Sequence, residues 1–302
     1  MIATFTEVRE RLNLPRDVRE LARQSSHIVL GSDSTRLVYR VASDDASTPC
    51  MTQIGVLQSH YLAARMSAGG LNVVAPTSHH PLRPNGYIVS IYPMMEPMTG
   101  RGWMDSDPFI LGAEMAKWAD FDTVGMRRLN VPEYVRERIQ TAYATTGTPT
   151  LLDAARLCDE ELARLQVSYP WTELEQNTGC VHGDPHLGNL VRRVAGERPL
   201  FIDLDYVAAG PALFDLAIIS MYQTRYNSEF PFAEIASGYA SVAPNIDMDE
   251  LFGLRMWKEL SSQTQLLTRW SLEGIRGEFY SRATNGLGAN WVNVIGTPVN
   301  SG

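Results

Sequence analysis

The sequence predicts an α+β protein in which a small part rich in β-strands precedes a larger, mainly helical part. Strand-like runs at 27–30, 36–41, 73–77 and 86–92 gather in the first third of the chain, and their β-branched and aromatic residues favour strands. From residue 107 onwards, apolar residues recur at helical spacing, as they do over 107–120. We therefore expect a small antiparallel sheet followed by a helical body.

Two helices are expected before the first strand. Phe5, Val8 and Leu12 are spaced as on one helical face, which predicts a helix over 4–12. A similar apolar spacing predicts a second helix over 15–24, with Pro15 at its first position.

The first two strands are joined by a short turn of small polar residues, Gly31-Ser32-Asp33-Ser34-Thr35. A polar loop follows the second strand and leads to a helix predicted over 54–69, which ends at Gly69-Gly70. Helices in the second part are predicted at about 107–120, 131–145, 149–167, 212–223, 230–242 and 248–273, and the tail 283–302 is predicted to be loop or partly disordered.

One stretch concentrates side chains that handle metals or protons. Asp184, Asn189 and Asp203 lie within 20 residues, and the residues between the last two form two short strand-like runs, 190–194 and 199–204, joined by a turn that contains Gly196. A hairpin brings its outer ends together, so Asn189 and Asp203 are expected side by side, with Asp184 on the loop just before. Carboxylate and amide oxygens suit Mg²⁺, which prefers oxygen ligands.

The order of these motifs resembles a known family. His182-Gly183-Asp184 with Asn189, then Ile202-Asp203-Leu204-Asp205, then 210–217 with Asp215, is similar to the aminoglycoside phosphotransferase and choline kinase branch of the protein kinase-like fold. The resemblance implies a bilobal fold, with a small antiparallel-sheet N-terminal lobe and a mainly helical C-terminal lobe.

The resemblance also implies roles in phosphoryl transfer. Asp184 is expected to accept the proton of the attacking hydroxyl, while Asn189 and Asp203 are expected to hold Mg²⁺. Asp205 is expected either to assist the metal or to make a structural hydrogen bond. His186 is expected either to contact phosphate or to be a plain loop residue. His182 is expected to pack in the core of the catalytic loop, with a metal role as the alternative.

The co-substrate is expected to be ATP or GTP. The run 37–41 is similar to the family strand whose cation reaches the α- and β-phosphates, which places Arg40 in that role; a solvent-facing arginine is the alternative. The turn with Ser32 and Ser34 is expected either to cover the phosphates or to be an ordinary hairpin turn.

The segment 95–100 resembles the hinge between the two lobes, where backbone groups contact the base. Since Pro97 has no N–H, the usable groups are the Glu96 carbonyl and the Met98 amide. The boundary is placed here, giving a nucleotide-covering lobe over 1–95 and a catalytic and substrate-binding lobe over 96–302.

One position departs from the family pattern. The helix over 54–69 offers Ser59, beside His60, where the family has a glutamate that pairs with the strand cation. The partner of Arg40 therefore stays open at this point.

Composition and charge argue against several classes of protein. A net charge of −8 argues against a nucleic-acid binder, and no run approaches the roughly 20 apolar residues of a membrane span. Neither a signal peptide, a disulfide framework nor a zinc site is predicted, because the start lacks a basic and apolar pattern and the three cysteines are widely spaced. We expect a cytoplasmic protein, either monomer or dimer.

The resulting hypothesis is an ATP- or GTP-dependent O-phosphotransferase that acts on a small-molecule alcohol. An aminoglycoside or related antibiotic is the leading acceptor, in resistance or self-protection. The alternatives are a metabolite kinase for choline, homoserine, a sugar or a nucleoside, and a non-catalytic pseudokinase that only binds nucleotide.

Overall fold

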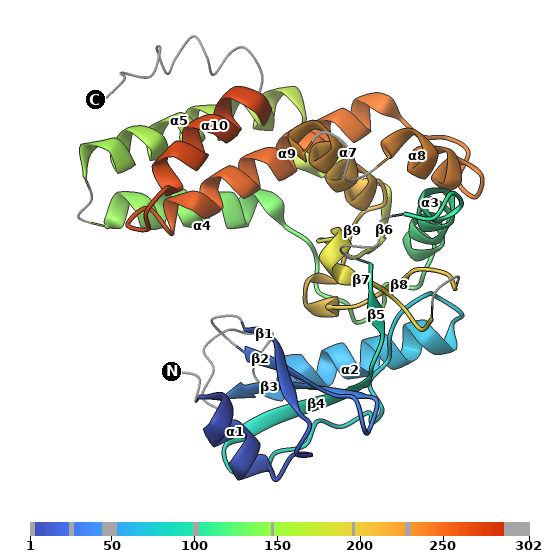
Figure 1. The fold of residues 1–302 in the computed structure, drawn as a ribbon. Helices are drawn as coiled ribbons and strands as arrows, with labels where there is room; N and C mark the ends of the chain where they lie inside the picture. The colour runs from blue at the N-terminus through green and yellow to red at the C-terminus, as the bar shows by residue number, and fades with distance from the viewer. Residues whose placement is uncertain are drawn as a thin grey trace. The chain divides into compact units, whose positions relative to one another are not determined.

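Figure 1 shows the computed structural model of the chain. The structure describes residues 4–23, 27–43, 53–98, 103–145, 148–194, 197–226 and 231–286. The chain forms two compact units, of which the first takes residues 1–107 and 186–206 and the second takes 108–185 and 207–302. The lobe boundary predicted at 95–100 stays a prediction, since residues 99–102 lie outside the described part.

The first unit is built on a four-stranded antiparallel sheet of order β1-β2-β3-β4. Its strands are β1 (Arg19–Arg23), β2 (His27–Ser32), β3 (Leu37–Ser43) and β4 (Tyr87–Pro93). The strands predicted at 27–30, 36–41 and 86–92 are thus confirmed.

The helix predicted over 15–24 is wrong, because this segment contains the edge strand β1. The amide of Val18 donates to the carbonyl of Pro15 in a turn, and the next residues pair with β2. Val18 is buried, whereas Leu21 is 42% exposed. The apolar spacing that suggested a helix therefore arose from one core residue and an exposed edge strand.

Helices lie against both faces of the sheet. Helix α1 (Phe5–Leu12), begun by a capping box between Thr4 and Glu7, packs over the face that carries Tyr39 and Val41. Successive residues of a strand point to opposite faces, so Arg40 faces the other way. On that face α2 (Gln53–Ala68) approaches β4 through the 2.8 Å hydrogen bond between His60 and Ser90. Arg40 is therefore positioned under α2.

A second small sheet of the first unit has the order β5-β7-β8, formed by Glu96–Pro97, Leu190–Arg192 and Leu200–Phe201. Strands β7 and β8 form the predicted antiparallel hairpin. The strand predicted at 73–77 is wrong: Val73 makes only an isolated bridge to Phe201, which supports the hairpin from its outer side.

The second unit is mainly helical, with one two-stranded antiparallel sheet, β6 (Thr178–Val181) with β9 (Ala208–Pro211). Its helices are α3 (Asp107–Ala119), α4 (Val131–Ala144), α5 (Pro149–Ser168), α6 (Trp171–Leu174), α7 (Phe214–Tyr226), α8 (Phe232–Ala240), α9 (Met248–Leu267) and α10 (Ile275–Gly286). The helices predicted in these regions are confirmed.

The C-terminal end of the predicted helix 248–273 needs correction. Helix α9 ends at Leu267, and the chain turns through Gly274, whose φ of +78° suits glycine, before α10 begins. Part of the tail predicted as loop, residues 283–286, belongs to α10. The rest of that tail lies outside the described residues.

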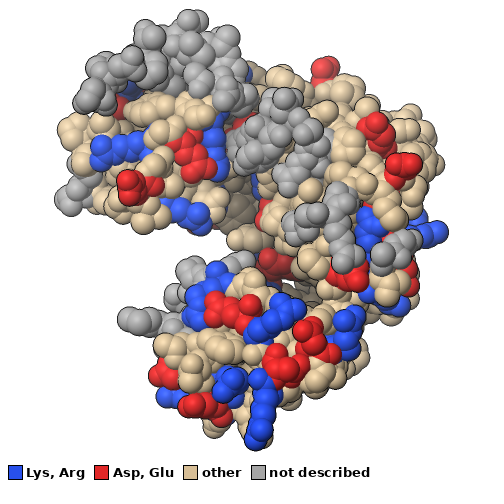
Figure 2. Space-filling model, viewed as in Figure 1, with Lys and Arg blue, Asp and Glu red and all other residues tan. Residues whose placement is uncertain are grey.

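Among the described residues, no helix is long and apolar enough to span a membrane, and Cys158 and Cys180 are buried free thiols. Figure 2 shows acidic and basic side chains interspersed over the visible face, without a broad basic field.

Helices α3 and α8 touch backbone to backbone through two glycines. A Cβ on Gly112 would lie 1.8 Å from the carbonyl oxygen of Ile235, and a Cβ on Gly238 would lie 1.9 Å from that of Phe109. Neither distance can be accommodated without moving a helix.

We expect Gly112→Ala to lower the free energy of unfolding by about 1–3 kcal/mol, because the added methyl group must separate the two helices. Thermal and urea unfolding would measure it. The matched control is Gly277→Ala in α10, where an added Cβ meets nothing within 4 Å; there the change should be neutral or slightly stabilising. Equal losses in the two variants would contradict the close packing.

Candidate functional site

The loop that carries Asp184 follows a buried strand of the second unit. Strand β6 leads into His182, which has no exposed surface and whose ring lies 5.6 Å from that of Trp118. The expectation that His182 packs beneath the loop agrees with this burial.

The backbone of the loop is held by Asp215, in the first turn of α7. Its carboxylate accepts hydrogen bonds from the amides of His182, at 2.6 Å, and Gly183, at 2.8 Å. Burial raises the pKa of Asp215, while His182 and the two amides oppose the rise. Gly183 has a φ of +81°, a conformation that costs glycine little. The direction of the chain entering Asp184 is thereby fixed.

Two further helical side chains reach the loop. Lys258 of α9 donates a 3.1 Å hydrogen bond to the carbonyl of Gly183, and its ammonium lies 6.0 Å from the centre of the Phe214 ring. The hydroxyl of Tyr222, in α7, donates a 3.1 Å hydrogen bond to Oδ1 of Asp184. Sequence reasoning assigned neither contact; the one available signal was the seven-residue spacing of Asp215 and Tyr222, which puts both on one helix face.

In the first unit, the predicted hairpin brings Asn189 to the segment of Asp203. The amide of Ile202 donates to the carbonyl of Asn189 at 3.0 Å. Asn189 is buried at the end of a short 3₁₀ turn, Leu187–Asn189, in which the ring of His186 accepts a hydrogen bond from the amide of Gly188. His186 thus has a structural role here; phosphate contact stays a prediction.

Asp203 is in a left-handed backbone conformation, with φ of +60°. Aspartate tolerates this region better than most residues, but such positions concentrate at functional sites. The bend leads from β8 (Leu200–Phe201) into the 3₁₀ turn Leu204–Tyr206.

Asp205 supplies the partner of Arg40 that the sequence left open. Arg40 Nη1 donates to Oδ1 of Asp205 at 3.0 Å, and Nη2 donates to its second oxygen; Nη2 also lies 3.5 Å from Asp203. Burial alone would lower the pKa of Arg40, but the two aspartates outweigh burial and raise it. The ion pair joins β3 to the turn after β8.

Beside Ser59, the helix α2 buries a histidine against β4. His60, next to Ser59, forms a hydrogen bond with Ser90, and its ring meets the Tyr92 ring edge-on with 6.0 Å between the ring centres.

A second buried histidine, His27, has its pKa lowered to about 4. Burial is the main cause, the charge of Arg40 adds to it, and the charge of Asp205 opposes it.

The turn expected over the phosphates is a closed hydrogen-bonded unit. The hydroxyls of Ser32 and Ser34 donate to the carboxylate of Asp17 at 3.0 and 2.8 Å, and the amide of Ser34 donates to it at 2.7 Å. This turn joins the second and third strands of the sheet, since β1 precedes it. The turn between β1 and β2, residues 24–26, lies outside the described part of the chain.

The segment expected to contact the base belongs to the second small sheet. Glu96 pairs with Arg192, and the amide of Met98 donates to the carbonyl of Leu190 at 3.1 Å. This amide is therefore engaged within the protein, and the predicted contact between Met98 and a base does not fit this conformation. Arg192 is fixed in turn by a buried ion pair with Asp107.

The residues around Asp203 fit a magnesium site in their chemistry. An amide oxygen and a carboxylate are offered from adjacent strand ends, as Mg²⁺ requires. Asp205, also predicted as a ligand, is turned to Arg40 instead. Among the described residues, no three His, Cys, Asp or Glu side chains gather as a metal site.

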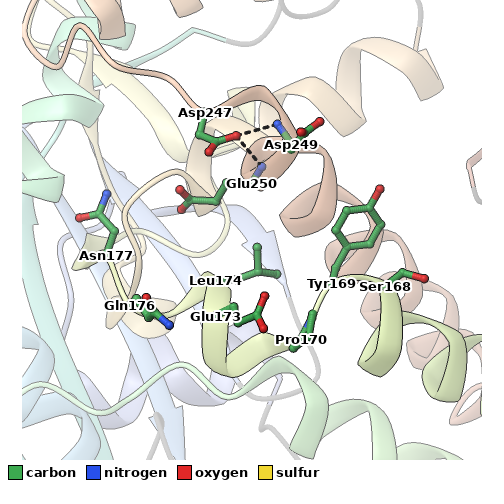
Figure 3. Close-up of a pocket in the computed structure, with 10 residues that line it drawn as sticks. All are labelled: Ser168, Tyr169, Pro170, Glu173, Leu174, Gln176, Asn177, Asp247, Asp249 and Glu250. Carbon is green, nitrogen blue, oxygen red and sulfur yellow. Dashed lines mark hydrogen bonds between the residues drawn. The ribbon is translucent and has the colours of Figure 1, made fainter.

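A cavity of about 650 Å³ lies elsewhere in the second unit, between α6 and the start of α9 (Figure 3). Its acids include Asp247, which caps α9 by accepting from the amides of Asp249 and Glu250. Acids are ordinary at the beginning of a helix, so their presence here is explained by the fold.

Comparison with known proteins places the chain among phosphotransferases. Residues 29–251 match the sequence model of the phosphotransferase enzyme family, named APH. A comparison with curated proteins finds no match.

Solved structures resemble the chain over nearly its whole length. A choline/ethanolamine kinase family protein from Mesorhizobium loti is 16% identical, with a TM-score of 0.63 over 97% of this chain and 95% of that one. A thermostable mutant of aminoglycoside phosphotransferase APH(4)-Ia is 15% identical, with a TM-score of 0.65 over 92% and 98%. Spectinomycin phosphotransferase APH(9)-Ia, in complex with ADP and spectinomycin, is 14% identical, with a TM-score of 0.56 over 93% and 89%. The predicted kinase-like α+β fold is therefore confirmed.

We expect Asp205→Asn to lower the free energy of unfolding by about 3 kcal/mol, because the buried Arg40 guanidinium loses the carboxylate that binds it through two hydrogen bonds and keeps only Asp203, at 3.5 Å. Urea unfolding would measure the loss. Glu160→Gln is the control: it breaks an ion pair with Arg156 whose side chains are 54% and 56% exposed, and should change stability by about 0.5 kcal/mol or less. A loss no larger than that of the control would contradict the role of the Arg40–Asp205 pair.

Acid should destabilise the fold through His27. Its folded pKa of about 4 lies below the ordinary 6.5, so between these values the unfolded chain binds the proton and the folded chain does not. Stability should therefore fall as pH drops from 6.5 towards 4. His60, whose pKa is also lowered by burial, acts in the same direction.

Urea unfolding across this pH range, for the wild type and His27→Asn, isolates the contribution. The variant should show the shallower loss of stability with acid. Parallel curves for the two proteins would refute the burial of a neutral His27.

Proposed function

Because this chain belongs to the phosphotransferase enzyme family, we propose that it transfers the γ-phosphate of ATP or GTP to a hydroxyl of an aminoglycoside or related antibiotic. Membership of the family makes the chain a small-molecule phosphotransferase, which is an enzyme. The proposal covers the nucleotide, the antibiotic acceptor, a resistance or self-protection role and the roles of individual residues.

The observation that carries the proposal is the fixed carboxylate of Asp184. Its loop is bound by Asp215 and Lys258, and its Oδ1 accepts from Tyr222. Phosphoryl transfer depends on orienting the attacking hydroxyl, since the protein takes little covalent part. A carboxylate held on a rigid loop is suited to that task.

In the proposed reaction, the hydroxyl of the acceptor donates a hydrogen bond to Asp184 and its oxygen attacks the γ-phosphorus. The new P–O bond forms as the bond between that phosphorus and the bridging oxygen of the nucleoside diphosphate breaks. The hydroxyl proton passes to Asp184, and the nucleoside diphosphate leaves with the bond electrons.

Residues of the first unit support the proposed nucleotide site. Arg40 presents a guanidinium, held in place by Asp205, of the kind that binds phosphate through two donors. Asn189 and Asp203 would hold Mg²⁺, which when bound neutralises charge on the phosphates. His186 directly precedes the 3₁₀ turn Leu187–Asn189 and is a candidate phosphate contact.

The acceptor class is proposed by analogy with structural neighbours. APH(4)-Ia has been solved with AMP-PNP and hygromycin B, and APH(9)-Ia with ADP and spectinomycin. A metabolite kinase is the second candidate, because a choline/ethanolamine kinase family protein matches 97% of the chain; choline comes first in that class, before homoserine, sugars and nucleosides.

A pseudokinase is not favoured, because Asp184, Asn189 and Asp203 are all present. The proposal includes a nucleoside triphosphate and a small alcohol as partners, without nucleic acid or membrane. A cytoplasmic location and a monomeric or dimeric state remain part of the prediction.

Coupled ADP release should identify the acceptor and test the base. We expect ADP release above background with at least one compound among hygromycin B, spectinomycin, other aminoglycosides, choline and homoserine. Asp184→Asn should lower turnover by about 10²–10⁴-fold, because it removes the proton acceptor, with little effect on the affinity for ATP.

Asp153→Asn, at an exposed position of α5, is the control and should retain full activity. Asn189→Ala and Asp203→Ala should weaken Mg²⁺-dependent nucleotide binding, as well as turnover. Equal ATP affinities in all variants would contradict this division of roles, and an active Asp184→Asn enzyme would exclude Asp184 as the base.

A further inference from the structure

Helix α7 (Phe214–Tyr226) contacts the loop of Asp184 at two levels. Asp215 binds the loop backbone, and Tyr222 reaches the Asp184 side chain. Seven residues correspond to nearly two turns, so both side chains lie on one face of the helix, about 10 Å apart along its axis. Side chains on a helix lean towards its N-terminus, which brings the long Tyr222 ring back towards the loop.

The helix is a rigid support for this contact. Leu216, Ile218 and Ile219 are fully buried, and Met221, beside Tyr222, is 1% exposed. A hydroxyl on such a helix is held in place by packing, which is what a precise polar contact requires.

The loop backbone alone does not fix the orientation of the Asp184 carboxylate. The terminal torsion of aspartate is broad, with two nearly equivalent settings, so a fixed backbone does not by itself determine where the oxygens point. Asp215 and Lys258 bind backbone atoms of residues 182 and 183. The 3.1 Å bond from Tyr222 to Oδ1 acts on the carboxylate itself and favours one orientation of it.

We propose that Tyr222 is a positioning residue for the reaction: its hydroxyl, donating to Oδ1 of Asp184, holds the carboxylate in the rotamer that receives the proton of the acceptor. The inference rests on the proposed function, because it takes Asp184 as the base. Tyr222 acts through Asp184 and is not itself a proton acceptor in the reaction.

Tyr222→Phe removes the hydroxyl and keeps the ring. With whichever acceptor the ADP-release panel identifies, kcat should fall by roughly tenfold, as expected for one hydrogen bond to a charged group, while KM for ATP is unchanged. In an Asp184→Asn background, Tyr222→Phe should cause no further loss, because its effect passes through the carboxylate.

Tyr239→Phe is the matched control. Tyr239 lies in α8 of the same unit and its hydroxyl donates to a backbone carbonyl, that of Ala212, at 3.2 Å. Tyr239→Phe removes a tyrosine hydroxyl that does not bond Asp184, so kcat should be retained.

An acceptor-independent measurement separates this inference from the proposed function. The carboxyl ¹³C resonance of Asp184 at neutral pH, assigned by its loss in Asp184→Asn, should move in Tyr222→Phe and stay in place in Tyr239→Phe. An unmoved resonance in Tyr222→Phe, an unchanged kcat, or an equal additional loss in the Asp184→Asn background would overturn the proposal. If the resonance moves but no tested compound supports ADP release, the hydrogen bond stands and the proposed role in catalysis fails together with the proposed function.

Discussion

The buried carboxylate of Asp215 is the constraint on which the loop of Asp184 depends. It is 4% exposed and accepts the amide protons of His182 and Gly183, so two backbone groups that the loop cannot pair internally are satisfied by one side chain. Removing it would leave both amides buried without this acceptor, which costs more than a surface hydrogen bond. Tyr222, which bonds Asp184 from the same helix, is placed relative to this anchor.

The first unit relies on a comparable anchor of opposite charge. Arg40 emerges from the middle of β3 on the face away from α1, and Asp205 holds it with two hydrogen bonds. A buried pair of this kind costs desolvation on both sides and adds little net stability against apolar residues. Its value is positional, because it fixes a guanidinium beside Asp203 and ties the sheet to the segment that follows β8.

Local pattern predicted much of this arrangement, and its failures have physical causes. The hairpin that joins Asn189 to Asp203 follows from two short apolar runs and a polar turn, so it could be predicted without the fold. The partner of Arg40 lies 165 residues away, and no local signal reports a contact at that separation. In the sequence, no local signal distinguishes Tyr222 from an aromatic residue of the core, because its hydrogen bond to Asp184 depends on the fold. Strand β1 was mistaken for a helix because a short edge strand leaves no clear alternation of buried and exposed residues.

Two expected nucleotide contacts rest on the resemblance to the kinase-like family, and hydrogen bonds inside the protein engage those groups. Asp17 engages Ser32 and Ser34, and Leu190 engages the amide of Met98. In the proposed reaction, Asp184 orients an alcohol for attack on the γ-phosphorus. Its most direct test is to incubate the enzyme with ATP carrying ¹⁸O in the γ-phosphoryl group and analyse the acceptor by mass spectrometry. We expect a phosphate ester that contains the labelled phosphoryl group and the acceptor's own oxygen. Labelled inorganic phosphate with an unmodified acceptor, for every compound tested, would refute phosphoryl transfer to an alcohol.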